Sequence, residues 1–170
     1  MRILVTAMLS AIVLLGISCG KDKDDSRQRR FISLKLDDRV YLSENPKGII
    51  TLPNLTDENP DNDYPTMEIT GQSYNGDVIT FSLATASMPF KPGVYPATQK
   101  GNGLLIALNS TYYTNLTSAG STDFQITITH IDNLNVEGTF SGTLKDASGA
   151  GGTRVTKNGA FRAMISQQGQ

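Results

Sequence analysis

The sequence predicts an all-β domain over residues 31–166, either an antiparallel, curved β-sandwich or a flattened, lipocalin-like β-barrel. Apolar and polar residues alternate with a period of two in many short segments, and no stretch after residue 18 keeps a helical period. Glycine, asparagine and proline separate these segments, which is typical of sandwiches and barrels. The expected strands cover 31–37, 48–52, 66–73, 77–84, 94–98, 104–110, 124–131, 136–145, 153–157 and 160–166.

Residues 1–18 have the composition of a cleaved signal peptide. Arg2 precedes an apolar run from Ile3 to Ile17, shorter than the roughly 20 residues that a membrane-spanning helix needs. The small residues Gly16 and Ser18 stand just before Cys19, the only cysteine. This stretch resembles a bacterial lipoprotein signal, which implies that Cys19 becomes the first residue and carries at least two acyl chains, such as palmitate. A buried thiol is incompatible with the dense charge that follows.

Residues 19–30, "CGKDKDDSRQRR", are expected to form a solvated tether, because no apolar residue after the cysteine could be buried. The lysines and aspartates also resemble the acidic export signal of Bacteroidota lipoproteins, which implies a lipid-anchored, cell-surface location at the outer membrane. A periplasm-facing location is the alternative. Residues 167–170 are expected to be a polar tail.

Charge and cysteine content exclude several classes of partner. The chain has 15 basic and 16 acidic residues, without the basic stripe that nucleic-acid binding requires. A lipidated Cys19 leaves no thiol for a disulfide, so the core alone must hold the domain together. No pattern in the sequence points to a cofactor.

Three expected hairpins follow from the rule that paired residues share a face of the sheet. At Asn75–Gly76, a three-residue loop keeps apolar residues opposite one another, whereas a two-residue loop mixes the two faces. The same argument predicts a "KNG" hairpin at Asn158–Gly159 and an odd-numbered loop through "DNLN". The expected pairs are Ile69 with Phe81, Met67 with Leu83, Val155 with Phe161, Ile128 with Gly138 and Ile126 with Phe140.

Three glycines, Gly71, Gly138 and Gly142, fall on inward faces of the expected strands. Inward glycine indicates strong curvature or a bulky neighbour that approaches closely, and we favour this structural interpretation. The alternative is room for a ligand.

The segments "TDFQITITHIDNLNVEGTFSGTLK" and "TRVTKNGAFRAMI", within 122–165, resemble a family of uncharacterised Bacteroidota lipoprotein domains. The opening "FISLKLDDRVYL" matches more loosely, with Asp37–Asp38 in place of an Asp-Gly turn and Tyr41 in place of tryptophan. The resemblance implies a β fold and an envelope location, and it supplies no catalytic residues.

Four sets of residues are candidates for chemistry. His130, the only histidine, could be a general base oriented by Asp132, but we favour a strand-end histidine hydrogen-bonded to loop backbone. A lone histidine and a lipidated cysteine exclude a histidine–cysteine metal site. The loop 52–65 offers oxygen ligands for calcium without EF-hand spacing, and a solvated connection is the favoured interpretation. Its carboxylates are Asp57, Glu58, Asp61 and Asp63, beside Asn59 and Asn62.

The tyrosines and two strand carboxylates complete the set. Tyr64, Tyr112 and Tyr113 could form a platform that stacks against sugars, together with Tyr74 and Tyr95. The absence of tryptophan favours packing roles instead. A glycosidase would need paired carboxylates, and nothing singles out Glu68 and Glu137, which lie on polar strand faces.

The sequence therefore predicts a lipid-anchored, non-enzymatic binding or accessory module. It would take a small ligand or a glycan, or dock on an outer-membrane transporter or surface lipoprotein, through loops 53–64, 85–93 and 111–122. The alternative function is a carboxylate-based hydrolase that acts on envelope or extracellular polysaccharide.

Overall fold

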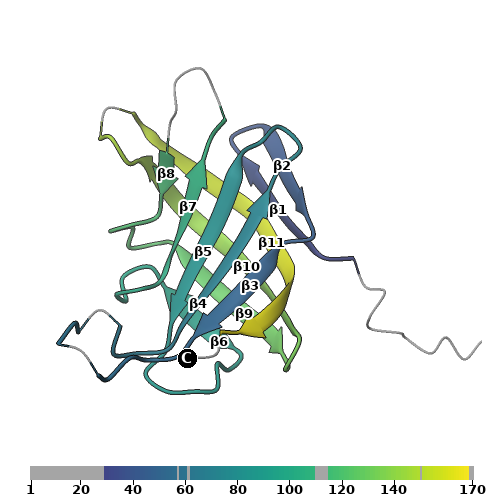
Figure 1. Cartoon of the computed structure of the whole chain (residues 1–170). Coiled ribbons are helices and arrows are strands. Elements are labelled where there is room, and N and C mark those ends of the chain that lie inside the picture. Colours follow the sequence, from purple (N-terminus) through teal and green to yellow (C-terminus); the bar gives the residue numbers. More distant parts are fainter. Residues whose placement is uncertain (1–28, 57, 61, 110–114, 150, 169–170) are drawn as a thin grey trace, which may run out of the picture.

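The computed structural model describes residues 29–56, 58–60, 62–109, 115–149 and 151–168. These residues form eleven strands and no helix, so the predicted all-β class is confirmed (Figure 1). The strands are β1 (Phe31–Leu36), β2 (Arg39–Glu44), β3 (Lys47–Thr51), β4 (Thr66–Gln72), β5 (Val78–Ala84), β6 (Gly93–Pro96), β7 (Gly103–Ala107), β8 (Asn115–Thr117), β9 (Gln125–Ile131), β10 (Asn135–Asp146) and β11 (Thr153–Gln167).

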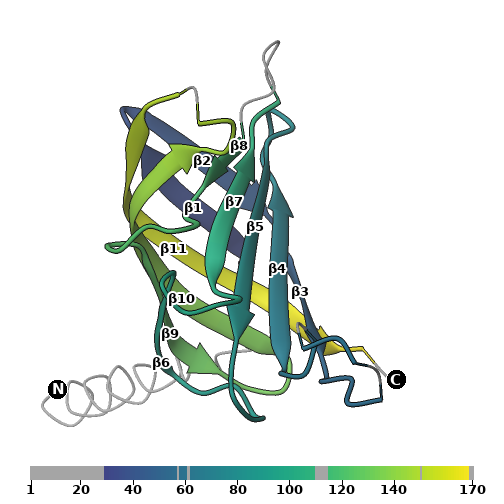
Figure 2. The same cartoon turned by 90° about the vertical axis from the view of Figure 1, so that its left-hand side faces the viewer.

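The strands belong to one sheet that closes on itself as a barrel. Its order is β2-β1-β11-β3-β4-β5-β7-β8-β10-β9-β6, and β10 pairs in addition with β11. The closed ring therefore runs through β11, β3, β4, β5, β7, β8 and β10, as Figures 1 and 2 show from two sides. The expected antiparallel arrangement holds for every named strand pair except β3 and β11, which are parallel.

One edge of the long strand β11 serves two neighbours. β1 pairs with its first part, from Thr156 to Arg162, and β3 pairs with its last part, from Met164 to Gln167. No ladder joins β2 to β4, and an isolated bridge pairs Ser43 of β2 with Ser73, the residue after β4. Neither β2 nor the short β8 was expected as a strand of its own from the sequence.

The β4–β5 hairpin has the predicted register. Ile69 pairs with Phe81 and Met67 pairs with Leu83. The backbone of Ser73 and Asp77 closes a three-residue loop, in which Gly76 has a φ of 86°. Glycine adopts this left-handed conformation without the steric cost that a Cβ brings, so the local sequence determines the turn.

The β9–β10 hairpin has the predicted pairs but not the predicted loop. Ile128 lies opposite Gly138, and Ile126 lies opposite Phe140. The loop is even, however, because Ile131 pairs with Val136 across four residues. An irregularity beside Gly138 then shifts the register by one residue, which restores the pairing of the apolar faces.

The hairpin expected at Asn158–Gly159 is wrong. These residues lie inside the continuous strand β11, where Asn158 has a φ of 52°. The register with β10 shifts there, from Phe140 opposite Gly159 to Gly142 opposite Thr156, which is a bulge. Val155 consequently pairs with Thr143 instead of Phe161. A local turn signal was overridden because β10 is long enough to pair with both halves of β11.

The interior of the barrel is a packed core. The rings of Phe81 and Phe140 lie 4.7 Å apart, and those of Phe81 and Phe161 lie 5.2 Å apart. A Cβ at Gly138 would lie 2.6 Å from Phe161 Cζ, and one at Gly71 would lie 2.9 Å from Ile32 Cδ1. The inward glycines thus admit bulky neighbours, as the favoured interpretation predicted, and the space beside them is not free for a ligand.

Asn102 links β5 to β6 where no backbone ladder joins them. Its Oδ1 accepts a hydrogen bond from the Ala84 amide at 2.8 Å, and its Nδ2 donates to the Pro96 carbonyl at 3.2 Å. Asn102 is buried, so these partners replace water for both groups. One side chain therefore connects the two strands.

Candidate functional site

One hollow among the described residues is a groove at one end of the barrel, which we call the end groove. Its volume is about 480 Å³. Four segments meet there: the end of β3, the β5–β6 loop, the β9–β10 turn and the end of β11. The lining residues are Ile50, Met88, Pro89, Phe90, Ile131, Asp132, Asn133, Ile165, Ser166 and Gln167.

The β5–β6 loop is anchored to the barrel by aromatic packing. Phe90 is buried, and its ring lies 6.3 Å from that of Tyr95 on β6. The Tyr95 hydroxyl donates to the Lys91 carbonyl at 2.9 Å. These contacts hold one wall of the end groove against β6.

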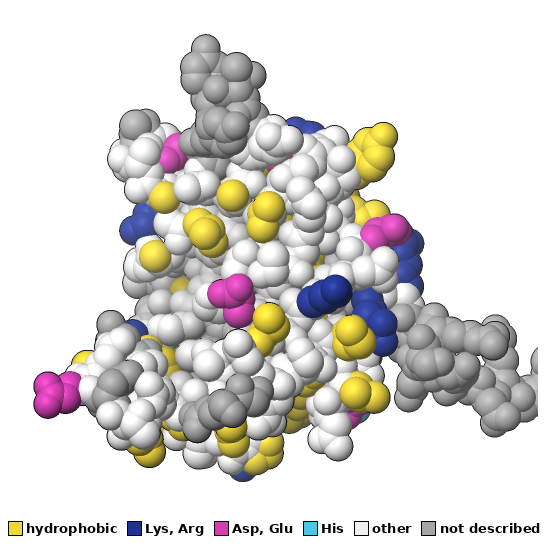
Figure 3. Space-filling view, viewed as in Figure 1, with side chains coloured by type: hydrophobic (Ala, Val, Ile, Leu, Met, Phe, Trp, Pro, Cys, Tyr) yellow, Lys and Arg dark blue, Asp and Glu magenta, His cyan; other side chains and the backbone are white. Residues whose placement is uncertain are grey.

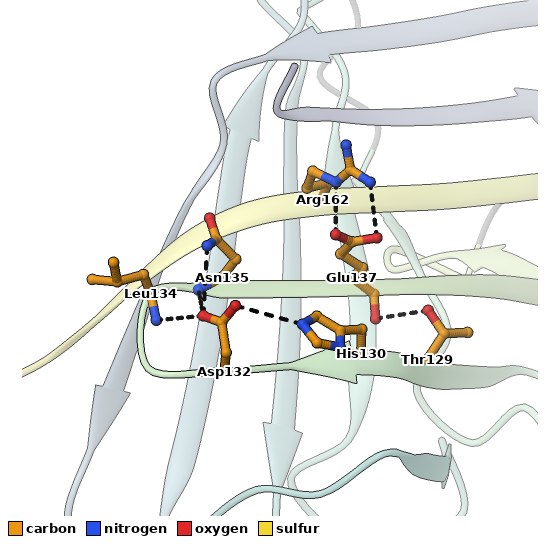
Figure 4. Close-up of polar contacts among 7 residues, drawn as sticks. All are labelled: Thr129, His130, Asp132, Leu134, Asn135, Glu137 and Arg162. Carbon is orange, nitrogen blue, oxygen red and sulfur yellow. Dashed lines mark hydrogen bonds and ion pairs between the residues drawn. The ribbon is translucent and has the colours of Figure 1, made fainter. Parts of the chain in front are cut away.

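The opposite wall is a turn organised by Asp132. Its Oδ1 accepts hydrogen bonds from the backbone N–H groups of Leu134 and Asn135, each at 2.7 Å (Figure 4). These bonds, that of Leu134 first, lower the pKa of the Asp132 carboxyl below its ordinary value of 3.8, against a smaller opposing effect of burial. The Leu134 carbonyl in turn accepts from the Ile165 amide at 2.8 Å, which ties the turn to β11.

His130 lies beside this turn, on the outer side of β9. Its Nε2 is 3.5 Å from Asp132 Oδ2, and the side chain is 61% exposed (Figure 4). His130 and Asp132, the two residues of the suggested general base, are thus close together in the structure. The Asp132 carboxylate is nevertheless engaged by the turn, and His130 is not among the residues that line the end groove.

The strand carboxylates Glu68 and Glu137 do not form a pair. Glu137 binds Arg162 through two contacts, with Arg162 Nε at 2.9 Å from Oε1 and Nη2 at 3.0 Å from Oε2 (Figure 4). Glu68 lies on β4, on the outer face, opposite Ser82 of β5. The ion pair of Glu137 is half-buried and joins β10 to β11, which is a structural role.

Of Tyr64, Tyr112 and Tyr113, the structure describes Tyr64. It is half-buried and lines a smaller groove of about 240 Å³, together with Ala84, Thr85, Ala86, Gln99 and Lys100. This groove lies near the same end of the barrel as the end groove, because Ala84 and Thr66 pair at that end of β4 and β5. Tyr112 and Tyr113 lie outside the described residues, as does Cys19.

The calcium candidates are only partly described. Glu58 and Asp63 are exposed, while Asp57 and Asp61 lie outside the described residues. Among the residues that the structure describes, no three histidine, cysteine, aspartate or glutamate side chains are grouped so as to hold a metal ion.

The three predicted binding loops do not meet at one end. Loops 53–64 and 85–93 both leave the end where Thr66 pairs with Ala84. The part of 111–122 that starts β8 lies toward the opposite end, since Asn115 pairs with Ala107 and Ala107 pairs with Val78.

Sequence reasoning missed a second hollow, of about 440 Å³, beside the β4–β5 turn. Leu42, Glu44, Gln72, Ser73 and Tyr74 line it, and Tyr74 is fully exposed. The lining comes from β2 and from the end of β4, an approach of distant segments that no local pattern signals.

No family model, no curated protein and no solved structure matches this chain. Within the described ranges there is also no helix of the length and apolarity needed to cross a membrane.

Proposed function

We propose that the chain is a lipid-anchored protein of the bacterial outer membrane, exposed at the cell surface, whose β domain is a non-enzymatic binding or accessory module. The end groove is the observation that carries this proposal. Its ligand would be a small molecule, a glycan, or a loop of an outer-membrane transporter or surface lipoprotein.

Two properties of the barrel support binding at its end. The axis is filled by buried phenylalanines and aliphatic side chains, so a ligand has no place inside. The end groove combines apolar Ile50, Phe90 and Ile165 with polar Asp132 and Asn133. Its volume falls within the roughly 300–1,000 Å³ of ordinary ligand sites, which share this mixed character.

A carboxylate-based polysaccharide hydrolase is the alternative proposal, with Asp132 as the carboxylate nearest to a bound substrate. A general acid of such an enzyme needs a raised pKa, so that it holds its proton at neutral pH. The turn amides lower the pKa of Asp132 instead. This direction supports a binding role over an acid–base role.

The anchor is tested by metabolic labelling of the full-length chain with an alkyne palmitate analogue. We expect label in the membrane fraction from wild type and none from Cys19→Ala. Equal labelling of both proteins would overturn the lipidation proposal.

The binding role is tested by a mild-detergent pull-down of the tagged lipoprotein from native membranes, with released glycans and proteins identified by mass spectrometry. Asn133→Trp fills the end groove, and Tyr74→Trp is the control at the other end. We expect a stoichiometric partner or glycan with wild type and Tyr74→Trp, but not with Asn133→Trp. Hydrolysis of envelope polysaccharide that disappears in Asp132→Asn would favour the alternative.

A further inference from the structure

The chain as a whole has nearly equal numbers of basic and acidic residues, but the two kinds are distributed unevenly over the strands of the barrel. The tether-side face comprises residues 29–51 and 153–168, which contain β1, β2, β3 and β11. Its acidic residues are Asp37, Asp38 and Glu44, and its basic residues are Arg29, Arg30, Lys35, Arg39, Lys47, Arg154, Lys157 and Arg162. The described remainder reverses this ratio, with basic Lys91, Lys100 and Lys145 against acidic Glu58, Asp63, Glu68, Asp77, Asp123, Asp132, Glu137 and Asp146.

Half of the basic side chains on the tether-side face have acidic partners. These pairs are Arg29 with Glu44, Lys35 with Asp38, Arg154 with Asp37, and Arg162 with Glu137. The other four, Arg30, Arg39, Lys47 and Lys157, form no ion pair with any described carboxylate. An excess of positive charge therefore remains on this face. In Figure 3, lysine and arginine side chains gather toward the side where Figure 1 places β1, β2 and β3.

Two of these cations face each other directly. Lys35 of β1 pairs in register with Lys157 of β11 on one side and with Val40 of β2 on the other. Like charges directly opposite each other destabilise a sheet. This cross-strand row therefore presents two positive charges outward, and only that of Lys35 has a carboxylate partner among the described residues, Asp38.

Exposed apolar side chains are interleaved with the cations. Val40 is 65% exposed, Val155 is 48% exposed and Leu42 is 40% exposed, all on β2 or β11. Basic and apolar groups together on one surface are the composition of proteins that lie on anionic membranes, because the cations meet headgroup phosphates and the apolar groups enter the boundary region.

The position of the anchor places this face near the bilayer. The chain reaches β1 through Arg29 and Arg30, and Arg29 is the tenth residue after Cys19. Even a fully extended segment of that length spans only about 35 Å. If Cys19 is lipidated, as proposed above, the tether-side face is held within this distance of the membrane.

We infer that the tether-side face docks on the anionic headgroups of the membrane that holds the anchor. The inference rests on the proposed lipid anchor for its biological setting, but the surface chemistry is separable from it. Docking would orient the barrel side-on.

The test uses the chain from Gly20 onward, which contains every described strand and the whole buried core but lacks the lipid. Co-sedimentation is measured with large vesicles of phosphatidylcholine alone, and of phosphatidylcholine with an equal part of phosphatidylglycerol. At about 0.15 M salt we expect binding to the anionic vesicles alone. Binding should fall about fivefold for each cation removed from the face, and hence about 25-fold for Lys47→Gln with Lys157→Gln.

The matched control is Lys91→Gln with Lys145→Gln, which removes the same charge from the opposite set of segments. Its binding should match that of wild type. Equal binding to both kinds of vesicle, no binding to either, or an equal loss in the control pair would overturn the docking face. Failure of palmitate labelling at Cys19 would instead overturn the anchor alone, so the two proposals fail separately.

Discussion

Gly138 shows how a single residue shapes the barrel core. It sits opposite Ile128 and beneath the ring of Phe161, and a Cβ there would lie 2.6 Å from Phe161 Cζ. We predict that Gly138→Ala lowers the free energy of unfolding by about 2–3 kcal/mol, because a packed core does not give way to an added methyl group.

Urea unfolding measures this loss. Circular dichroism is the probe, because the chain has no tryptophan for fluorescence. Gly152→Ala is the matched control, since a Cβ at Gly152 meets nothing within 4 Å. An unchanged unfolding midpoint in Gly138→Ala would mean that Phe161 is free to move, contrary to a filled interior.

Asp132 should make stability depend on pH through the turn that it organises. Its folded pKa lies below 3.8, so the folded state binds its proton less readily than the unfolded state. The stabilisation is therefore present above pH 3.8 and is lost as pH falls through the lowered folded value. We predict that Asp132→Ala costs about 1 kcal/mol at pH 7 and that the difference from wild type shrinks in acid.

Thermal unfolding of both proteins from pH 7 down to the acid limit of folding provides the measurement. If the difference in stability between the two proteins stayed constant across this range, the charge of the Asp132 carboxylate would not be what stabilises the turn.

Among the elements, β11 shows where local patterns stop being sufficient. The β4–β5 register followed from face matching, because the turn and both strands are adjacent in sequence. At Asn158–Gly159 the same reasoning failed, because the deciding partner was β10, whose full length pairs with β11. Local sequence signals a left-handed residue in both places, but only tertiary pairing decides between a turn and a bulge.

The bulge in β11 yields a prediction about Asn158. Asparagine tolerates its φ of 52°, whereas a β-branched residue does not. We predict that Asn158→Val lowers stability by about 1–2 kcal/mol and that Asn158→Gly leaves it nearly unchanged. Chemical denaturation of the two variants separates a bulge from a regular strand, in which valine would be favourable.

At the scale of the molecule, closure of the barrel was beyond sequence reasoning. Which strands close the ring depends on the β10–β11 pairing and on the parallel pairing of β3 with β11, and neither leaves a local signal. Loop 85–93, which the sequence suggested as a binding loop, contributes Met88, Pro89 and Phe90 to the end groove. Its other walls come from Asp132 and the end of β11. The sequence suggested Asp132 only as a partner for His130, and the end of β11 only as a strand.

The link that Asn102 makes between β5 and β6 offers a further test. Asn102→Ala would leave the buried Ala84 amide and the Pro96 carbonyl without their partner. We predict a loss of about 2–3 kcal/mol, since unsatisfied buried groups lose their solvation without compensation. Hydrogen exchange should show faster exchange at the Ala84 amide, and wild-type protection there in the variant would argue that another group makes this link.

The central claim is that ligand or partner binding occurs at the end of a filled barrel, in the end groove. The most direct measurement is photo-crosslinking of the full-length lipoprotein in native membranes, with benzoylphenylalanine placed at Asn133 or, at the opposite end, at Tyr74. We predict a discrete adduct from position 133 and none from position 74. Adducts of equal yield from both positions, or from position 74 alone, would contradict it.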